Sequence, residues 1–123
     1  MKILLATPDS DLRLAIELYL IEEPGVCIIG TASDAGSLLA LHKNTHPDLV
    51  FLDWDLPGKP ISRVIDELLT CCDKNKIIVL GKKMQIKEKA LSAGANDFVL
   101  RGDPPERFIN SFRKVRFNAS TTQ

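Results

Sequence analysis

The sequence places a carboxylate where an apolar strand should end. Residues 49–52 are Leu-Val-Phe-Leu, Asp53 follows them directly, and Asp55 comes two positions later. A carboxylate at the end of a hydrophobic strand loses hydration, so a positive or hydrogen-bonding group must compensate for it. Arg101, which follows another apolar run, is the candidate counter-charge. We therefore expect the chemistry of the chain to be centred on Asp53.

The elements that must position these residues alternate along the chain. Five short, continuous apolar runs begin roughly 21 to 28 residues apart, which leaves room for a helix and two short loops between them. Continuous runs of this kind are typical of strands buried on both faces of a sheet. The runs are Ile3–Ala6, Val26–Ile29, Leu49–Leu52, Ile77–Leu80 and Phe98–Leu100.

The intervals between the runs have helical periodicity. Ile61, Val64, Ile65, Leu68 and Leu69 follow the i, i+3, i+4, i+7, i+8 pattern of an amphipathic helix. Similar stripes predict helices over residues 12–20, 34–43, 84–93 and 104–115. Alternating strands and helices with right-handed crossovers give an α/β fold, a doubly wound five-stranded parallel sheet with helices on both faces.

Ligands of such sheets bind outside the carboxyl ends of the strands, which restricts the candidate site to a few positions. The pocket residues predicted there are Thr7, Pro8, Asp9, Asp53, Asp55, Gly81, Lys82 and Arg101.

Length and composition restrict the remaining possibilities. The 123 residues predict one domain over residues 1–117, followed by a polar tail or the start of a linker at 118–123. The 16 Lys and Arg residues balance 16 Asp and Glu residues. The chain therefore lacks the excess of basic residues that is typical of proteins in direct contact with nucleic acid. No apolar run approaches the roughly 18 residues of a membrane span, and no signal-peptide core is visible.

The three cysteines and two histidines offer no metal-binding or disulfide pattern. Cys71 and Cys72 are adjacent, and Cys27 lies in an apolar run where a buried thiol is expected. His42 is expected on a helix surface, and His46 is expected in a loop. We therefore expect a cytoplasmic protein.

The segment Pro47–Gly58 resembles the phosphoacceptor segment of bacterial response-regulator receiver domains, whose pattern is Pro-Asp-(apolar)-Asp-x-x-(Met/Leu)-Pro-Gly. The resemblance covers nearly the whole chain, including Gly94-Ala95-x-x-Phe98 and the helix start Arg101–Glu106. That helix start is similar to receivers of LuxR/NarL-type regulators, which carry a C-terminal DNA-binding domain. The resemblance implies the flavodoxin-like (βα)5 fold with strand order 2-1-3-4-5.

The resemblance also implies roles for the residues after the third strand. Asp53 would accept a phosphoryl group from the phosphohistidine of a partner kinase. Mg²⁺ would be held by Asp53 and the backbone carbonyl of Asp55, with Asp9 as a candidate further ligand, and it would neutralise charge on the transferring group. A receiver domain serves in two-component signal transduction and phosphorelay as a signalling module, so we expect no enzyme activity.

The sequence departs from the family pattern at three pocket positions. The family has an acidic pair directly after the first strand, where this chain has Thr7-Pro8 and an acid, Asp9, one position later. Gly81 stands where the family has Ser or Thr, and Arg101 stands where it has Lys. These departures predict an atypical receiver with weak Mg²⁺ binding and weak or lost phosphorylation. Asp53 is then either a working phosphoacceptor or a structural acid paired with Arg101, and Lys82 is a candidate to supply a lost charge.

Three other functions are compatible with parts of the sequence. The first is a conventionally phosphorylated receiver that regulates a LuxR-type DNA-binding output outside this chain. The second is a small haloacid-dehalogenase-like phosphatase, because Asp53-Trp54-Asp55 resembles its Asp-x-Asp motif; that family, however, places the motif on the first strand. The third, a flavodoxin or nucleotide binder, lacks the glycines of a phosphate loop at Thr7–Ser10.

The resemblance finally implies a partner surface made by the fourth helix, the fifth strand and the fifth helix. Arg101, Phe112, Arg113 and Arg116 are the residues predicted to contact a partner there. The partner would be a histidine kinase, an output domain or a second copy of the chain in a homodimer. Neither nucleic acid nor a membrane is expected to bind directly.

Overall fold

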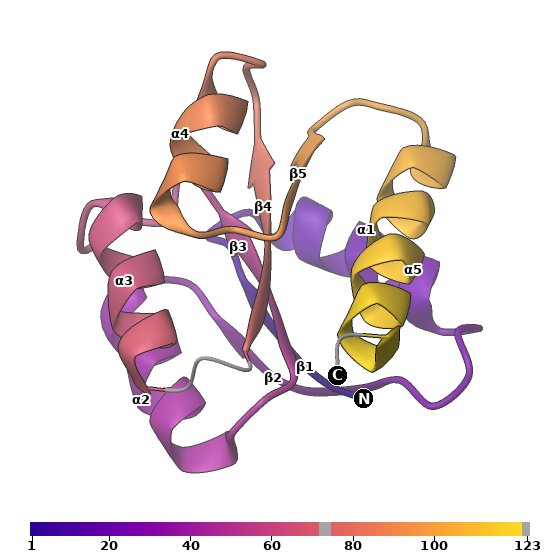
Figure 1. The fold of residues 1–123 in the computed structure, drawn as a ribbon, viewed down its shortest axis with the longest axis horizontal. Coiled ribbons are helices and arrows are strands. Elements are labelled where there is room, and N and C mark those ends of the chain that lie inside the picture. The colour runs from indigo at the N-terminus through magenta and orange to yellow at the C-terminus, as the bar shows by residue number, and fades with distance from the viewer. Residues whose placement is uncertain (72–74, 122–123) are drawn as a thin grey trace.

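The five apolar runs form one parallel sheet (Figure 1). The computed structural model describes residues 1–71 and 75–121, with side chains up to residue 117. The strands are β1 (Lys2–Ala6), β2 (Cys27–Ala32), β3 (Leu49–Asp53), β4 (Lys76–Gly81) and β5 (Asp97–Leu100). They lie in the order β2-β1-β3-β4-β5, and each neighbouring pair is parallel.

Helices cover both faces of the sheet. They are α1 (Ser10–Leu20), α2 (Ala35–Thr45), α3 (Ile61–Cys71), α4 (Ile86–Ala93) and α5 (Pro105–Thr121). In Figure 1, α1 and α5 lie on one face, and α2, α3 and α4 lie on the other. The predicted doubly wound α/β fold with strand order 2-1-3-4-5 is therefore confirmed.

Alternation along the strands divides the core into two layers. Val50 and Leu52 of β3 pack towards the face that α2 and α3 cover, while Leu49 and Phe51 pack towards the opposite face. Phe51 stacks on Phe108 of α5 with their ring centroids 4.8 Å apart. Because both faces of β3 are covered, its burial is continuous, and this explains its unbroken apolar sequence.

The second apolar run is less buried than its sequence predicts. It forms the edge strand β2, where Ile28 and Ile29 are only partly buried and Cys27 is exposed. The prediction of a buried Cys27 thiol is wrong, because the edge of the sheet has no neighbouring strand on that side. Cys71 is also exposed, and Cys72 lies outside the described residues.

His42 is buried, which corrects its predicted place on the helix surface. Its Nε2 contacts the side-chain amide of Asn75, which lies just before β4. Burial lowers the pKa of the imidazole, and the nearby His46 lowers it further. A neutral imidazole paired with an amide can be buried without leaving a charge inside the protein.

Helix α5 continues to Thr121, past the predicted domain boundary at 117. Residues 118–121 contain neither Gly nor Pro, so nothing in that sequence ends the helix earlier. The boundary itself stays a prediction, and residues 122–123 lie outside the described part of the chain. None of the described helices is long and apolar enough to span a bilayer.

Candidate functional site

The carboxyl ends of four strands bring the predicted pocket residues together. Thr7 follows β1, Asp53 ends β3, Gly81 ends β4 and Arg101 follows β5. The backbone N–H of Arg101 donates to the carbonyl of Gly81 (2.7 Å), which fixes the start of the last loop against β4. Pro8, also a predicted pocket residue, is exposed.

The Asp53 carboxylate is fully buried, at 0% exposure, and both of its oxygens accept hydrogen bonds. Oδ1 accepts from the backbone N–H of Asp55 (2.9 Å). Oδ2 accepts from the hydroxyl of Thr7 (2.6 Å) and from Nη1 of Arg101 (3.4 Å). The desolvation of this carboxylate is thus offset by three donors and one formal positive charge.

Asp9 lies between the start of α1 and Arg101. One oxygen, Oδ1, caps the helix by accepting from the backbone N–H groups of Asp11 (2.9 Å) and Leu12 (3.2 Å). The other, Oδ2, forms an ion pair with Nη2 of Arg101. The hydrogen bond from Leu12 and the one from Arg101 hold the pKa of the Asp9 carboxyl below its usual value. The single guanidinium of Arg101 therefore bridges Asp9 and Asp53.

Asp55 and Lys82 form a looser pair at the edge of the pocket. Their charged atoms are 3.7 Å apart, and about half or more of each side chain is exposed. Solvent screens such a pair strongly. Lys82 thus reaches Asp55, and among the described residues it forms no ion pair with Asp53.

The ring of Phe98 fills the space beside Gly81. A Cβ atom placed on Gly81 would lie 2.7 Å from the Phe98 ring and 3.2 Å from Ile86. Because such distances require neighbouring atoms to move, a hydroxyl-bearing residue would not fit at this position without rearrangement. The sequence shows that Gly81 has no hydroxyl, but it does not show that an aromatic ring occupies the space.

The pocket does not fit the Mg²⁺ that the family resemblance implies. A hard dication needs several oxygens with free lone pairs converging on it. Here Asp9 is occupied by a helix terminus and by Arg101, while Thr7 supplies a hydroxyl that donates to Asp53. Among the described residues, no group of three His, Cys, Asp or Glu side chains could hold a metal ion.

The sequence as a whole matches a known family. The model of the response regulator receiver domain matches residues 3–113. The chain belongs to this family.

Relatives of the receiver domain agree with that assignment. Protein CcdB of Bacillus subtilis is 31% identical over 98 residues, which cover 78% of this chain and 82% of that protein. The nitrate/nitrite response regulator NarL of Escherichia coli K12 is 25% identical over 115 residues, and this chain spans about half of it (53%). The crystal structure of the response regulatory domain of protein mrkE from Klebsiella pneumoniae superposes with a TM-score of 0.90 at 17% identity, over 99% of this chain and all of that one.

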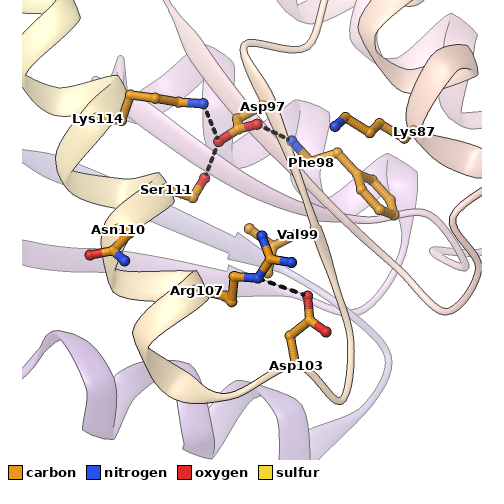
Figure 2. A pocket seen from close by; sticks show the side chains of 9 residues that line it. All are labelled: Lys87, Asp97, Phe98, Val99, Asp103, Arg107, Asn110, Ser111 and Lys114. Carbon is orange, nitrogen blue, oxygen red and sulfur yellow. Dashed lines mark hydrogen bonds and ion pairs between the residues drawn. The ribbon is translucent and has the colours of Figure 1, made fainter.

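The receiver domain has a second charged site, a cleft of about 280 Å³ between α4, β5 and α5 (Figure 2). Asp97 of β5 accepts from the hydroxyl of Ser111 (2.6 Å) and pairs with Nζ of Lys114 (3.1 Å). Burial raises the pKa of the Asp97 carboxyl, but hydrogen bonds from Ser111, Phe98 N–H and Lys114 outweigh it and leave the pKa below its usual value.

The cations of this cleft face solvent. Arg107 pairs with Asp103 across one helical turn (3.7 Å) and is 73% exposed, and Lys114 is 58% exposed. Lys87 of α4 reaches the cleft from the other side and forms no ion pair with any residue that the structure describes. The sequence offered one signal for this site, since Ser111 and Lys114 are spaced to share one face of a helix.

The predicted partner-surface residues lie elsewhere in the receiver domain. Phe112 is fully buried against Phe51, so it cannot contact a partner, because the apolar face of α5 packs on the sheet. Arg113 pairs with Glu23 (3.0 Å), and Arg116 donates to the carbonyl of Pro24 (2.6 Å), so both lie on the side of α5 that faces the α1–β2 loop. Arg101 is directed into the Asp53 pocket.

Proposed function

We propose that this receiver domain is an atypical one, which acts in two-component signalling as a protein-interaction module and accepts a phosphoryl group at Asp53 weakly or not at all. The observation that carries the proposal is the state of the Asp53 carboxylate, which is fully buried and has both oxygens engaged as acceptors.

Phosphoryl transfer to Asp53 would require this arrangement to open. The attacking oxygen must be reached by phosphorus, yet the carboxylate is fully buried. Oδ2 accepts from both Thr7 and Arg101, and only Oδ1, which accepts from Asp55 N–H, keeps a second lone pair. Breaking hydrogen bonds to a buried carboxylate leaves it unsatisfied, which costs about 1–3 kcal/mol or more. That cost adds to the barrier for phosphorylation.

The pocket also lacks groups that would stabilise the transferring phosphoryl. Phosphoryl transfer depends on positive charge placed around the equatorial oxygens. Mg²⁺ does not fit the residues present, and Gly81 offers no hydroxyl. The remaining cation near Asp53, Arg101, is already shared between two carboxylates.

The cleft between α4, β5 and α5 is the proposed partner surface. Exposed Arg107 and Lys114, together with Lys87, offer positive charge to a protein that carries carboxylates. We propose a histidine kinase or an output domain as that partner, with a homodimer through the same face as a further outcome. The net charge of +0 supports a protein partner over nucleic acid, and we propose a cytoplasmic location.

The conventional alternative is a phosphorylated receiver that controls a LuxR-type DNA-binding output. It is favoured by the intact segment Pro47–Gly58 and by the relationship to NarL, of which this chain spans only about half.

Incubation with acetyl phosphate and Mg²⁺, followed by intact-mass measurement, separates the two functions. The atypical receiver yields little or no acylphosphate, so neither the wild type nor Asp53→Asn gains a substantial amount of the phosphoryl adduct. Stoichiometric acylphosphate that is absent from Asp53→Asn would contradict the proposal and support the conventional receiver.

A charge reversal tests the partner surface. Lys87→Glu combined with Arg107→Glu should weaken binding to a partner, or shift a dimer towards monomer in sedimentation. Lys43→Glu, an exposed lysine on α2, is the matched control and should have no effect. Equal binding by both variants would exclude this cleft.

A further inference from the structure

We infer that the Arg101 guanidinium takes the place of a divalent cation in this receiver domain, pairing with Asp9 and Asp53 together and excluding metal ions. The inference rests on the proposed function, because both concern the carboxylates around Asp53. It goes further by assigning the exclusion of metal to one residue, so that removing this residue should create a cation site.

The geometry of Arg101 is that of a bridging counter-ion. Its side chain is only 16% exposed, and two different nitrogens reach two carboxylates from different elements. Nη2 pairs with Asp9 at the start of α1, and Nη1 lies 3.4 Å from Oδ2 of Asp53 at the end of β3. Arg101, which follows β5, therefore connects the start of α1 to the end of β3 through ion pairs and hydrogen bonds.

An arginine suits this role better than the lysine of the family. The guanidinium is planar and has separate donors that can serve two acceptors at once, whereas an ammonium is a compact point charge. Asp9 is held for this contact because its other oxygen caps α1. The contact of Arg101 with both carboxylates thus depends on the arginine and on the position of Asp9, one residue later than the acidic pair of the family.

Two of the three departures from the family pattern, the one after the first strand and Arg101, then form one arrangement. Thr7 replaces an acid with a hydroxyl that donates to Asp53, so the pocket carries less negative charge. Asp9 supplies an acid one residue later, and Arg101 spans the distance between it and Asp53. A second cation would meet the positive charge of Arg101 at the same two carboxylates, and Coulomb repulsion disfavours its entry.

The ion pair between Arg107 and Asp103 provides a matched comparison. It also joins an arginine to an aspartate near the end of β5, but Arg107 contacts one carboxylate and is mostly exposed. Its removal should leave no buried charge without a partner. A replacement of Arg101 and the same replacement of Arg107 should therefore differ in their response to cations.

The experiment measures the thermal unfolding of the full chain with and without Mg²⁺ or Mn²⁺. The wild type and Arg107→Gln should show no cation-dependent change in Tm. Arg101→Gln should unfold at a lower temperature without cation and regain at least about 4 °C with it. In the double variant Asp9→Asn, Arg101→Gln, this recovery should be largely lost, because one of the two carboxylates is gone.

A second variant covers the case in which Arg101→Gln does not fold. Arg101→Lys keeps one positive charge but frees one carboxylate. Its cation-dependent rise in Tm should therefore be larger than that of the wild type and smaller than that expected for Arg101→Gln. If neither Arg101 variant responds to cations more than the wild type does, the inference is overturned. That result would leave the proposed function standing, whereas stoichiometric acylphosphate in the wild type would end the proposed function by itself.

Discussion

The two charged sites of this receiver domain differ in how far their cations are exposed to solvent. Around Asp53 the carboxylates and their cation are turned inward, and Arg101 is 16% exposed. In the α4–β5–α5 cleft the carboxylate of Asp97 is sheltered, at 15% exposure, while Lys114 and Arg107 extend into solvent. The first site pairs its carboxylates with an internal cation, and the second exposes its cations to solvent. We therefore propose that the pocket contributes stability and that the cleft contributes recognition.

The greatest loss of stability is predicted for a replacement of Arg101 in the inward-facing pocket. Replacing Arg101 with Ala leaves a fully buried carboxylate without its counter-charge, which should lower the free energy of unfolding by about 3 kcal/mol or more. Arg107→Ala, on the outward-facing side, should change it by about 0.5 kcal/mol or less. Urea unfolding of both variants checks the difference, and similar losses in the two would show that the pocket and the cleft are not distinct.

A smaller loss of stability is predicted where Gly81 and Phe98 connect the pocket to the cleft. Gly81 borders the pocket, and Phe98 lines the cleft as well as packing on Gly81. Gly81→Ser should cost about 1–3 kcal/mol because the new Cβ overlaps the Phe98 ring.

The same change in a Phe98→Leu background should cost less, since the smaller side chain leaves room. If the losses of stability caused by Gly81→Ser and Phe98→Leu simply add in the double variant, the Phe98 ring is not what excludes a larger residue at position 81.

Between pH 7 and pH 5, the change of stability with pH is expected to come from the buried imidazole of His42 and not from the carboxylates of the two charged sites. The pKa of His42 is lowered by burial, so below about pH 6.5 the unfolded chain binds a proton that the folded protein does not. Stability should therefore fall as pH decreases from about 6.5, by at most about 1.4 kcal/mol per pH unit.

The carboxyls of Asp9 and Asp97 have lowered pKa values, so their contributions should persist until the pH falls below about 4. Urea unfolding between pH 7 and pH 5 measures the slope, and His42→Gln should flatten it. An unchanged slope in His42→Gln would assign the loss to another group.

The smallest effect is expected at the edge of the pocket. Lys82 pairs with Asp55 at 3.7 Å in a largely exposed position. Lys82→Gln should change stability by less than about 0.5 kcal/mol and should leave the cation response of the wild type unchanged. A new cation response in this variant would place Lys82, alongside Arg101, among the residues that exclude metal.

Most of the fold could be predicted from the sequence. The apolar runs and helical stripes predict five strands and five helices, because burial on both faces of a parallel sheet leaves a continuous apolar pattern. The same reasoning failed at Cys27, since an apolar run does not show whether its strand is central or at the edge. It also failed at His42, where a partner distant in sequence, Asn75, makes burial acceptable.

The site was predicted only in part, for a related reason. The ends of the strands identify which residues meet, and the structure does bring Thr7, Asp9, Asp53 and Arg101 together. The sequence could not show that Arg101 contacts two acids, nor that a ring fills the space beside Gly81, because both depend on side-chain directions. Phe112 was misplaced because the family resemblance assigned the fifth helix to a partner surface, while the position of Phe112 on that helix faces the core.

Titration of the wild-type protein with Mg²⁺, followed through the fluorescence of Trp54, shows whether Arg101 keeps metal ions from Asp53. Trp54 is the single tryptophan of the chain and is adjacent to Asp53, so an ion bound at that carboxylate should alter its emission. Because Arg101 already pairs with both Asp9 and Asp53, no saturable change is predicted at micromolar Mg²⁺. A saturable change in the micromolar range, absent from Asp53→Asn, would contradict the account.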